Sequence, residues 1–121
     1  MQKRIYPIWH EDKKIWFTDW SNLNNDDDAI AAIKETSEFV VEMGEYDLLE
    51  IIDIRGSYAT PAILKALKHS AKITKPFGKK KVMVGLKGSK KILLSLVNRF
   101  VDESIIALNT IEEAKEWLVK E

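Results

Sequence analysis

The fold is decided by the stretch DLLEIIDIRGSYATPAILKAL, residues 47–67. Its first part, 47–54, is apolar almost throughout, which predicts a strand that is covered on both faces. A helix is predicted to follow over 61–74, because Thr60 is a preferred N-cap residue and Pro61 suits the first helical position. A strand that passes through a short loop into a helix is the repeating unit of a parallel α/β sheet.

Strand and helix patterns alternate on both sides of this stretch. Upstream, aromatic and branched residues predict an antiparallel pair of strands at 4–9 and 14–20, followed by a helix from about 27 to 43. Downstream, the pattern predicts a strand at 81–86, a helix at 89–100, a short strand at 104–108 and a last helix that opens at Thr110.

The resulting order is β-β-α-β-α-β-α-β-α, in a single domain that covers residues 1–121. We expect an α/β fold with a mixed, mostly parallel sheet, because strands that alternate with helices are joined by right-handed crossovers. Pro7 has no backbone N–H to donate to a ladder, so the first strand should form an antiparallel N-terminal edge.

Composition narrows the class of protein. Of the 121 residues 45% are hydrophobic, which is enough for one core. The absence of cysteine excludes disulfides, cysteine nucleophiles and cysteine-based metal sites. The first residues lack the apolar run of a secretory signal, and we therefore expect a cytoplasmic protein.

Charge is distributed unevenly along the chain. Residues 1–60 hold six basic and thirteen acidic residues, a net charge of −7, while residues 61–121 hold thirteen basic and six acidic residues, a net charge of +7. A local field of one sign attracts partners of the other. Two interpretations stay open: the lysines are solvated, or face the acidic half of the same fold or of a second copy in a homodimer; or they meet an anionic partner.

In open α/β sheets, ligands and partners gather beyond the carboxyl ends of the strands. Two strand-to-helix loops, 55–61 and 85–91, should lie at that edge, and each brings a helix N-terminus with unpaired N–H groups. We expect the loops to be adjacent, with Tyr58 and Lys87 as near neighbours. The residues predicted to bind a partner or ligand are Arg55, Ser57, Tyr58, Thr60, Lys87, Gly88, Ser89 and Lys90.

Catalytic chemistry is not indicated by the sequence. The two histidines, His10 and His69, do not form a metal-binding pair, and no nucleophile–base pair is apparent. The 85–91 loop has a Gly-Ser-Lys order in place of the Gly-Lys-Ser/Thr of a phosphate-binding loop. We predict a non-enzymatic protein with no catalytic residue, cofactor or metal. Nucleic acid is not an expected partner, because the aromatic residues lie mostly in the acidic half and are not interleaved with the lysines.

Three segments carry a family resemblance: IWFTDWSNL (15–23), KPFGKKKVMVGLKGSKKILLSLVNRF (75–100) and NTIEEAKEWLV (109–119). They include a Lys-Pro-Phe turn, a Val-Gly-x-x-Gly strand-to-helix loop, a Val-Asn-Arg-Phe helix end and a closing Glu-Ala-x-x-Trp-Leu helix. From about residue 14 to residue 121 the chain resembles the STAS domains, in the SpoIIAA-like branch of small bacterial proteins that are similar to anti-sigma-factor antagonists.

The resemblance implies a STAS fold and a regulatory role through protein–protein interaction. Classical members carry an Asp-Ser-Ser-Gly loop whose serine is phosphorylated by a partner kinase. The corresponding loop of this chain, 56–61, lacks that order, and its candidate phospho-acceptors by position are Ser57 and Thr60.

Some related proteins resemble the CRAL-TRIO lipid-binding fold, in which a shifting helix uncovers an apolar pocket. The predicted helix at 89–100 is apolar around much of its circumference, so Leu93, Leu96, Val97 and Phe100 are expected to form the wall of an apolar pocket or interface. Two functions are therefore expected. One is docking of a protein partner through the two loops; the other is binding or carrying a lipid-like apolar ligand, with peripheral contact to an anionic membrane surface.

Overall fold

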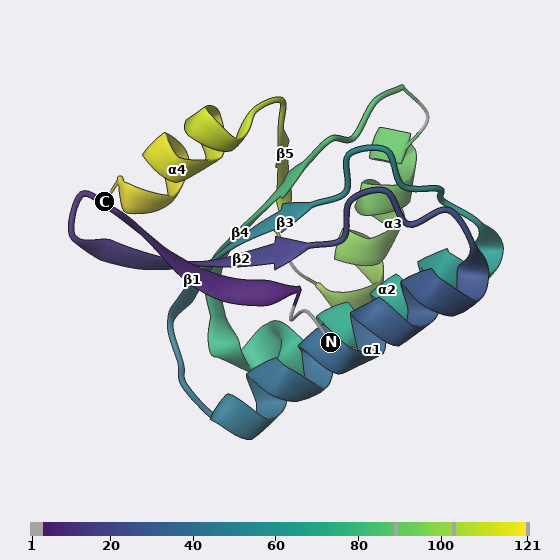
Figure 1. Ribbon diagram of the computed structural model, residues 1–121, viewed down its shortest axis with the longest axis horizontal. Helices are drawn as coiled ribbons and strands as arrows, with labels where there is room; N and C mark the ends of the chain where they lie inside the picture. Colours follow the sequence, from purple (N-terminus) through teal and green to yellow (C-terminus); the bar gives the residue numbers. More distant parts are fainter. Residues whose placement is uncertain (1–3, 89, 103, 121) are drawn as a thin grey trace.

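Sequence order and spatial order coincide in the sheet of this protein. The computed structural model describes residues 4–88, 90–102 and 104–120, and within them the chain forms five strands and four α-helices (Figure 1). The strands are β1 (Ile5–His10), β2 (Lys13–Asp19), β3 (Leu48–Asp53), β4 (Gly78–Val84) and β5 (Ile106–Leu108). The helices are α1 (Asp26–Met43), α2 (Pro61–Thr74), α3 (Lys90–Val101) and α4 (Ile111–Val119), and a short 3-10 turn occupies Lys75–Phe77.

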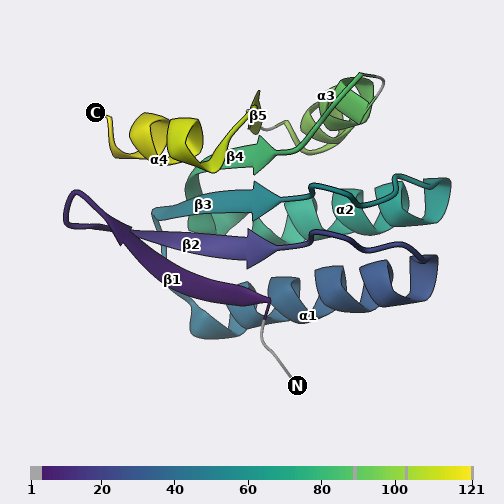
Figure 2. The same ribbon diagram turned by 45° about the horizontal axis from the view of Figure 1, so that its top comes forward.

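The sheet order is β1-β2-β3-β4-β5, with β1 antiparallel to β2 and the other pairs parallel. This confirms the α/β class, the mixed sheet and the antiparallel edge strand that Pro7 predicted. Because each parallel connection advances the sheet in the same direction, its helices collect on one face. Figures 1 and 2 show α1, α2 and α3 on that face and α4 on the opposite one.

Alternation along the strands supplies a core to each face. In β2, Ile15 and Phe17 belong to the cluster that α4 covers, whereas Trp20, just beyond its end, packs under α1. β3 divides in the same way, since Ile51 faces α4 and Ile52 faces the three-helix layer. Both faces of the sheet are therefore covered at β2 and β3, as the apolar stretch at 47–54 predicts for β3.

The starts of three helices are set by capping residues, two of which, Thr60 and Thr110, are predicted from the sequence. The side chain of Asn25 accepts the N–H of Asp28 at the start of α1, and Thr60 Oγ1 accepts the N–H of Ile63 at the start of α2. Thr110 does the same for α4. Each bond satisfies one of the N–H groups that a helix leaves unpaired, and so fixes where the helix begins.

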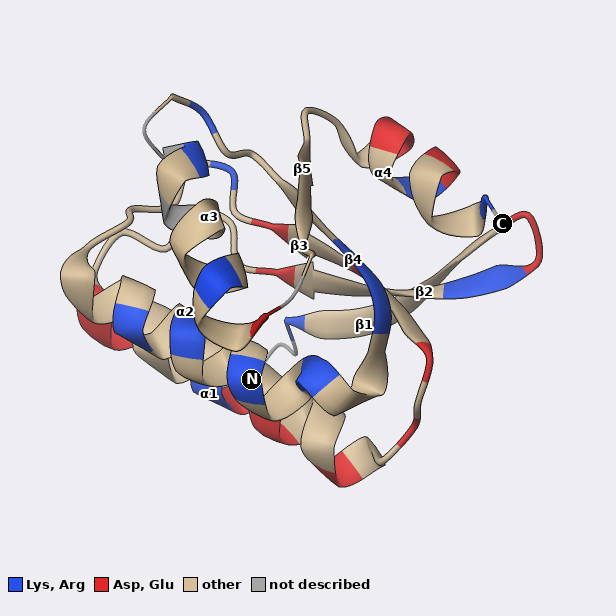
Figure 3. Ribbon diagram, turned by 180° about the vertical axis from the view of Figure 1, so that it is seen from behind, with Lys and Arg blue, Asp and Glu red and all other residues tan. Residues whose placement is uncertain are grey.

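The charge asymmetry of the sequence becomes an asymmetry between helices. Figure 3 shows basic residues in a row along α2 and on α3, while acidic residues gather along the neighbouring α1. Lys81 is an exception among the basic residues, because it is only 5% exposed and points from β4 into the protein. Among the described residues, no helix combines the length and the apolar character needed to cross a bilayer.

Candidate functional site

The loops that follow β2, β3 and β4 meet at the carboxyl end of the sheet. We call residues 20–25, 54–60 and 85–88 the carboxyl rim. The N–H of Asn22 donates to the carbonyl of Arg55 at 2.9 Å, and the N–H of Tyr58 donates to the carbonyl of Leu23 at 3.1 Å. The N–H of Ile54 donates to the carbonyl of Val84, again at 2.9 Å. The adjacency of the two predicted loops is confirmed, and a third loop joins them.

Gly85 allows the second and third loops to pack backbone against backbone. Its φ is 103°, in the region that favours glycine, and a Cβ at this position would lie 2.8 Å from the backbone nitrogen of Arg55. The close approach therefore needs a residue without a side chain. It holds the loop that carries Lys87 against the loop that carries Tyr58.

Ser57 fastens the rim from inside. Its hydroxyl accepts the N–H of Leu23 at 2.9 Å and donates to the carbonyl of Trp20, and the residue is 8% exposed. A hydroxyl that is buried in these bonds is not accessible to a kinase in this conformation. The structure therefore argues against Ser57 as a phospho-acceptor or as a direct partner contact, and gives it a positioning role instead.

The hydroxyl of Thr60 is likewise engaged in structural hydrogen bonds. Besides capping α2, its hydroxyl donates to Asp26 Oδ1 at 2.7 Å and so ties α2 to the start of α1. A phosphate on Thr60 would stand against that carboxylate, and like charges at this distance repel. The geometry does not favour Thr60 as a phospho-acceptor either.

Arg55 is held at the rim by a buried acid. Asp53 accepts from Nε and Nη2 of Arg55, each at 2.9 Å, and from its backbone N–H at 3.0 Å. The side chain of Asp53 is 4% exposed and that of Arg55 is 57% exposed. This hydrogen bonding, together with the carboxylate's charge, raises the pKa of Arg55, and partial burial opposes the rise. Asp53 thus positions a cation whose outer part faces solvent.

Besides Arg55, three of the predicted contact residues present their surfaces to solvent. Tyr58 is 60% exposed, and both Lys87 and Gly88 are exposed in the loop after β4. The prediction at Ser89 lies outside the described residues, and Lys90 is described only as the first residue of α3. The rim therefore offers one aromatic ring and, from Arg55 and Lys87, two cations.

An apolar pocket opens beside Tyr58, with a cavity of about 50 Å³ between the sheet and the helices. Of its lining residues, Tyr58 and Ala59 are exposed, so the mouth lies at the rim. Leu23 and Leu86 close its sides from the neighbouring loops, and both were missed by sequence reasoning. Each is a single apolar residue in an otherwise polar turn, and that pattern could have indicated a buried position.

Of the residues predicted to form the wall of an apolar pocket or interface, one lines this pocket, and for the exposed ones an interface stays a prediction. Val97 is 4% exposed and lines the pocket, whereas Leu96 and Phe100 are 37% and 51% exposed and are not among its lining residues. The side chain of Leu93 lies outside the described residues. Leu94, 7% exposed, is the other α3 residue that lines the pocket.

A second, more polar cavity of about 30 Å³ also lies between the sheet and the helices. Lys81 Nζ donates to Thr74 Oγ1 at 3.1 Å there, and the hydroxyls of Ser37 and Ser70 lie 2.6 Å apart across α1 and α2. Buried polar groups need such partners, because an unmet hydrogen bond in the interior is costly. The cavity is large enough for water and too small for an organic substrate.

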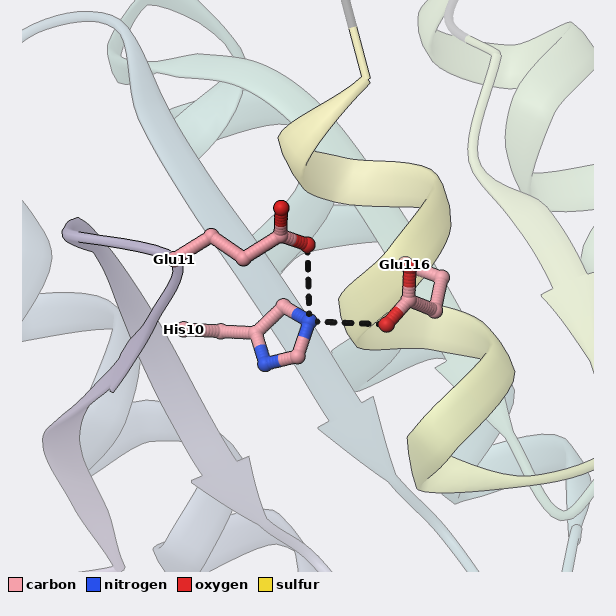
Figure 4. Close-up of side chains that lie close together, drawn as sticks. All are labelled: His10, Glu11 and Glu116. Atoms are coloured by element: carbon pink, nitrogen blue, oxygen red, sulfur yellow. Dashed lines mark hydrogen bonds and ion pairs between the residues drawn. The ribbon is translucent and has the colours of Figure 1, made fainter.

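Sequence reasoning also missed a cluster at the opposite end of the sheet. His10 Nε2 lies 3.0 Å from Glu116 Oε1 and 3.3 Å from Glu11 Oε2 (Figure 4). Among the described residues, these three are the group whose donor atoms come close enough to hold a metal ion, within 4.8 Å of one another. Imidazole and carboxylate are ligands that zinc accepts. The contact between His10 and Glu116 links the β1–β2 turn to α4.

No protein-family model matches the chain, and no curated protein matches its sequence.

Proposed function

We propose that this protein is a non-enzymatic interaction domain of the STAS type, which docks a protein partner on the carboxyl rim. The observation that carries the proposal is the apolar pocket whose mouth lies at Tyr58 and Ala59, on a rim built from adjacent strand-to-helix loops. Partner binding concentrates in a few anchor residues that fill such pockets beside exposed aromatic and arginine side chains.

The charge of the rim sets the chemistry of the partner. Arg55 is oriented by the buried Asp53, and Lys87 stands exposed in the adjacent loop. Arg55 and Lys87 directly follow the pocket-lining residues Ile54 and Leu86 in the chain. The proposed partner motif therefore carries a small apolar side chain next to carboxylates. Opposite charges of this kind raise the rate of encounter and fix the orientation of the complex.

A non-enzymatic role is supported by the way the rim uses its polar groups. The hydroxyls of Ser57 and Thr60 are engaged in hydrogen bonds that hold loops and helix starts. His10 lies at the β1–β2 turn and His69 on α2, so neither reaches the rim loops as a base. The rim residues therefore position a surface for contact.

The alternative of carrying a lipid-like ligand finds less support. The apolar cavity is about 50 Å³, a third of the roughly 150 Å³ that holds benzene in an engineered cavity. An acyl chain would need the helices to separate, whereas the side chain of an anchoring residue needs only the mouth. Native mass spectrometry tests the difference: a co-purifying lipid favours the carrier, and its absence favours the docking domain.

Site-specific photo-crosslinking in the native cells tests the docking directly. A crosslinking amino acid replaces Tyr58 in one variant and Tyr46 in the other. Tyr46 is the matched control, because it is 66% exposed and lies in the loop before β3, at the other end of the sheet. The proposal expects a discrete protein adduct from position 58 and none from position 46. Adducts that are absent at 58, or identical at both positions, contradict it.

A further inference from the structure

The outer face of α3 carries a continuous apolar ridge. Ile92, Leu96 and Phe100 are 64%, 37% and 51% exposed. Their spacing of four residues places them on one face of the helix, and at 1.5 Å per residue the ridge is about 12 Å long. We call these three residues the α3 ridge. The inner face of the same helix is formed by Leu94, Val97 and Val101, each no more than 7% exposed.

A row of lysines on α2 borders this ridge. Lys68 and Lys72 lie four residues apart on one side of α2, and Lys75 follows three residues later, at the start of the 3-10 turn that continues from the helix. Lys68 Nζ lies 5.6 Å from the centre of the Phe100 ring, and Lys75 Nζ donates to the carbonyl of Val101 at 2.7 Å. Both contacts place the lysine row against the end of α3. Figure 3 shows the row along α2 beside α3.

The segment that contains the ridge is rich in basic residues, although the exposed Asp102 follows directly after α3. Between Pro61 and Val101 the chain has eleven basic residues and no acidic one. Lys91 and Arg99, next to the ends of the ridge in sequence, are both exposed. An exposed apolar stripe among cations is complementary to a surface that is anionic outside and apolar underneath.

We propose that the α3 ridge and the α2 lysine row dock the protein on an anionic membrane surface, with α3 lying parallel to it. Amphipathic helices bind bilayers in this way, with the apolar face buried at the boundary of headgroups and acyl chains. Lysine stems cover apolar surface while their amines reach lipid phosphates. The inference concerns the outer face of α3 and does not depend on docking at the carboxyl rim.

Sedimentation with lipid vesicles provides the test. One set contains phosphatidylcholine alone, and the other mixes phosphatidylcholine with phosphatidylglycerol at a ratio of about 2:1. The wild-type protein is expected to partition at least about tenfold more strongly onto the anionic vesicles, and the difference should shrink as salt screens the charges. Equal binding to both sets, or no binding by the folded protein, overturns the proposal. In the second case an acidic protein would be the partner that the ridge fits.

Variants locate the contact on the protein. The double substitution Ile92→Ser with Phe100→Ser removes the ridge, and Lys68→Glu with Lys72→Glu reverses the row. Each should lower partition by about tenfold or more. The control is Ile30→Ser with Val41→Ser, at positions 36% and 42% exposed on the acidic α1, and it should bind like the wild type. With folding checked by circular dichroism, undiminished binding of both test variants, or equal loss in the control, overturns the proposal.

Discussion

Gly85 lies in direct contact with Arg55 across the carboxyl rim. A Cβ at residue 85 would lie 2.7 Å from Arg55 Cγ and 2.8 Å from its backbone nitrogen. The two loops that the proposed function depends on are therefore held together by a contact that no larger residue permits. Mutations at this contact test whether the loops of the carboxyl rim are tightly packed against one another.

Substitution of Gly85 by alanine is expected to lower the free energy of unfolding by about 2–3 kcal/mol, from backbone strain and the clash with Arg55. Gly88→Ala is the matched control, because Gly88 also has a positive φ, 57°, but has no atom within 4 Å of an added Cβ. Its cost should be about 1 kcal/mol. Urea denaturation measures both, and equal losses would show that the loops are not tightly packed here.

Ser57→Ala should destabilise the protein although it removes a single oxygen. The N–H of Leu23 and the carbonyl of Trp20 lose their partner in a buried place, which costs about 1–3 kcal/mol. Ser95→Ala is the control on exposed α3 surface, where the hydroxyl bonds only within its helix, and it should cost less than about 0.5 kcal/mol. If both variants unfold at the same urea concentration, the hydroxyl of Ser57 is not structural.

Tyr6 is expected to make the free energy of unfolding depend on pH in the alkaline range. Partial burial, followed by the charges of Asp19 and Asp53, raises the pKa of its phenol above the usual 10.0. A proton held more tightly in the folded state stabilises that state below the unfolded pKa, and the contribution is lost as pH rises through the folded pKa. Between about pH 8 and pH 11, Tyr6→Phe should therefore lose less unfolding free energy than the wild type. Equal losses contradict the effect.

The sequence predicts a helix boundary well when the capping residue lies next to the helix in the chain. Thr60 and Pro61 fix the start of α2, and the predicted helix at 61–74 matches the observed Pro61–Thr74. The start of β4 was predicted three residues late, because Gly78 reads as a breaker. Gly78 is instead the first residue of β4, because the 3-10 turn at Lys75–Phe77 ends directly before the strand.

The inner face of α3 could not be chosen from the sequence. The buried set includes Leu94 and Val97, whereas the exposed set includes Ile92 and Leu96, and both sets recur at helical spacing. A helix that is apolar on two sides gives a pattern that does not say which side meets the sheet. Packing against α2 decides it, and that contact joins residues far apart in the chain.

The sequence predicts the position of the candidate site in the fold better than it predicts which side chains are exposed there. Parallel strands put loops 55–61 and 85–91 at one edge, which the hydrogen bond from Ile54 to Val84 confirms. The burial of Ser57 was not predictable, because its partners Trp20 and Leu23 lie in the loop after β2. Local sequence shows a hydroxyl and does not show which way it points.

The most direct test of the proposed docking is the affinity of the crosslinked partner, once purified, for two double variants. Tyr58→Ser with Lys87→Glu alters the rim, and Tyr46→Ser with Lys79→Glu makes the same changes at exposed positions at the other end of the sheet. Loss of an aromatic anchor and reversal of a charge should weaken binding of the rim variant by about a hundredfold. The control variant should bind like the wild type. Equal affinities for the two variants would contradict docking on the carboxyl rim.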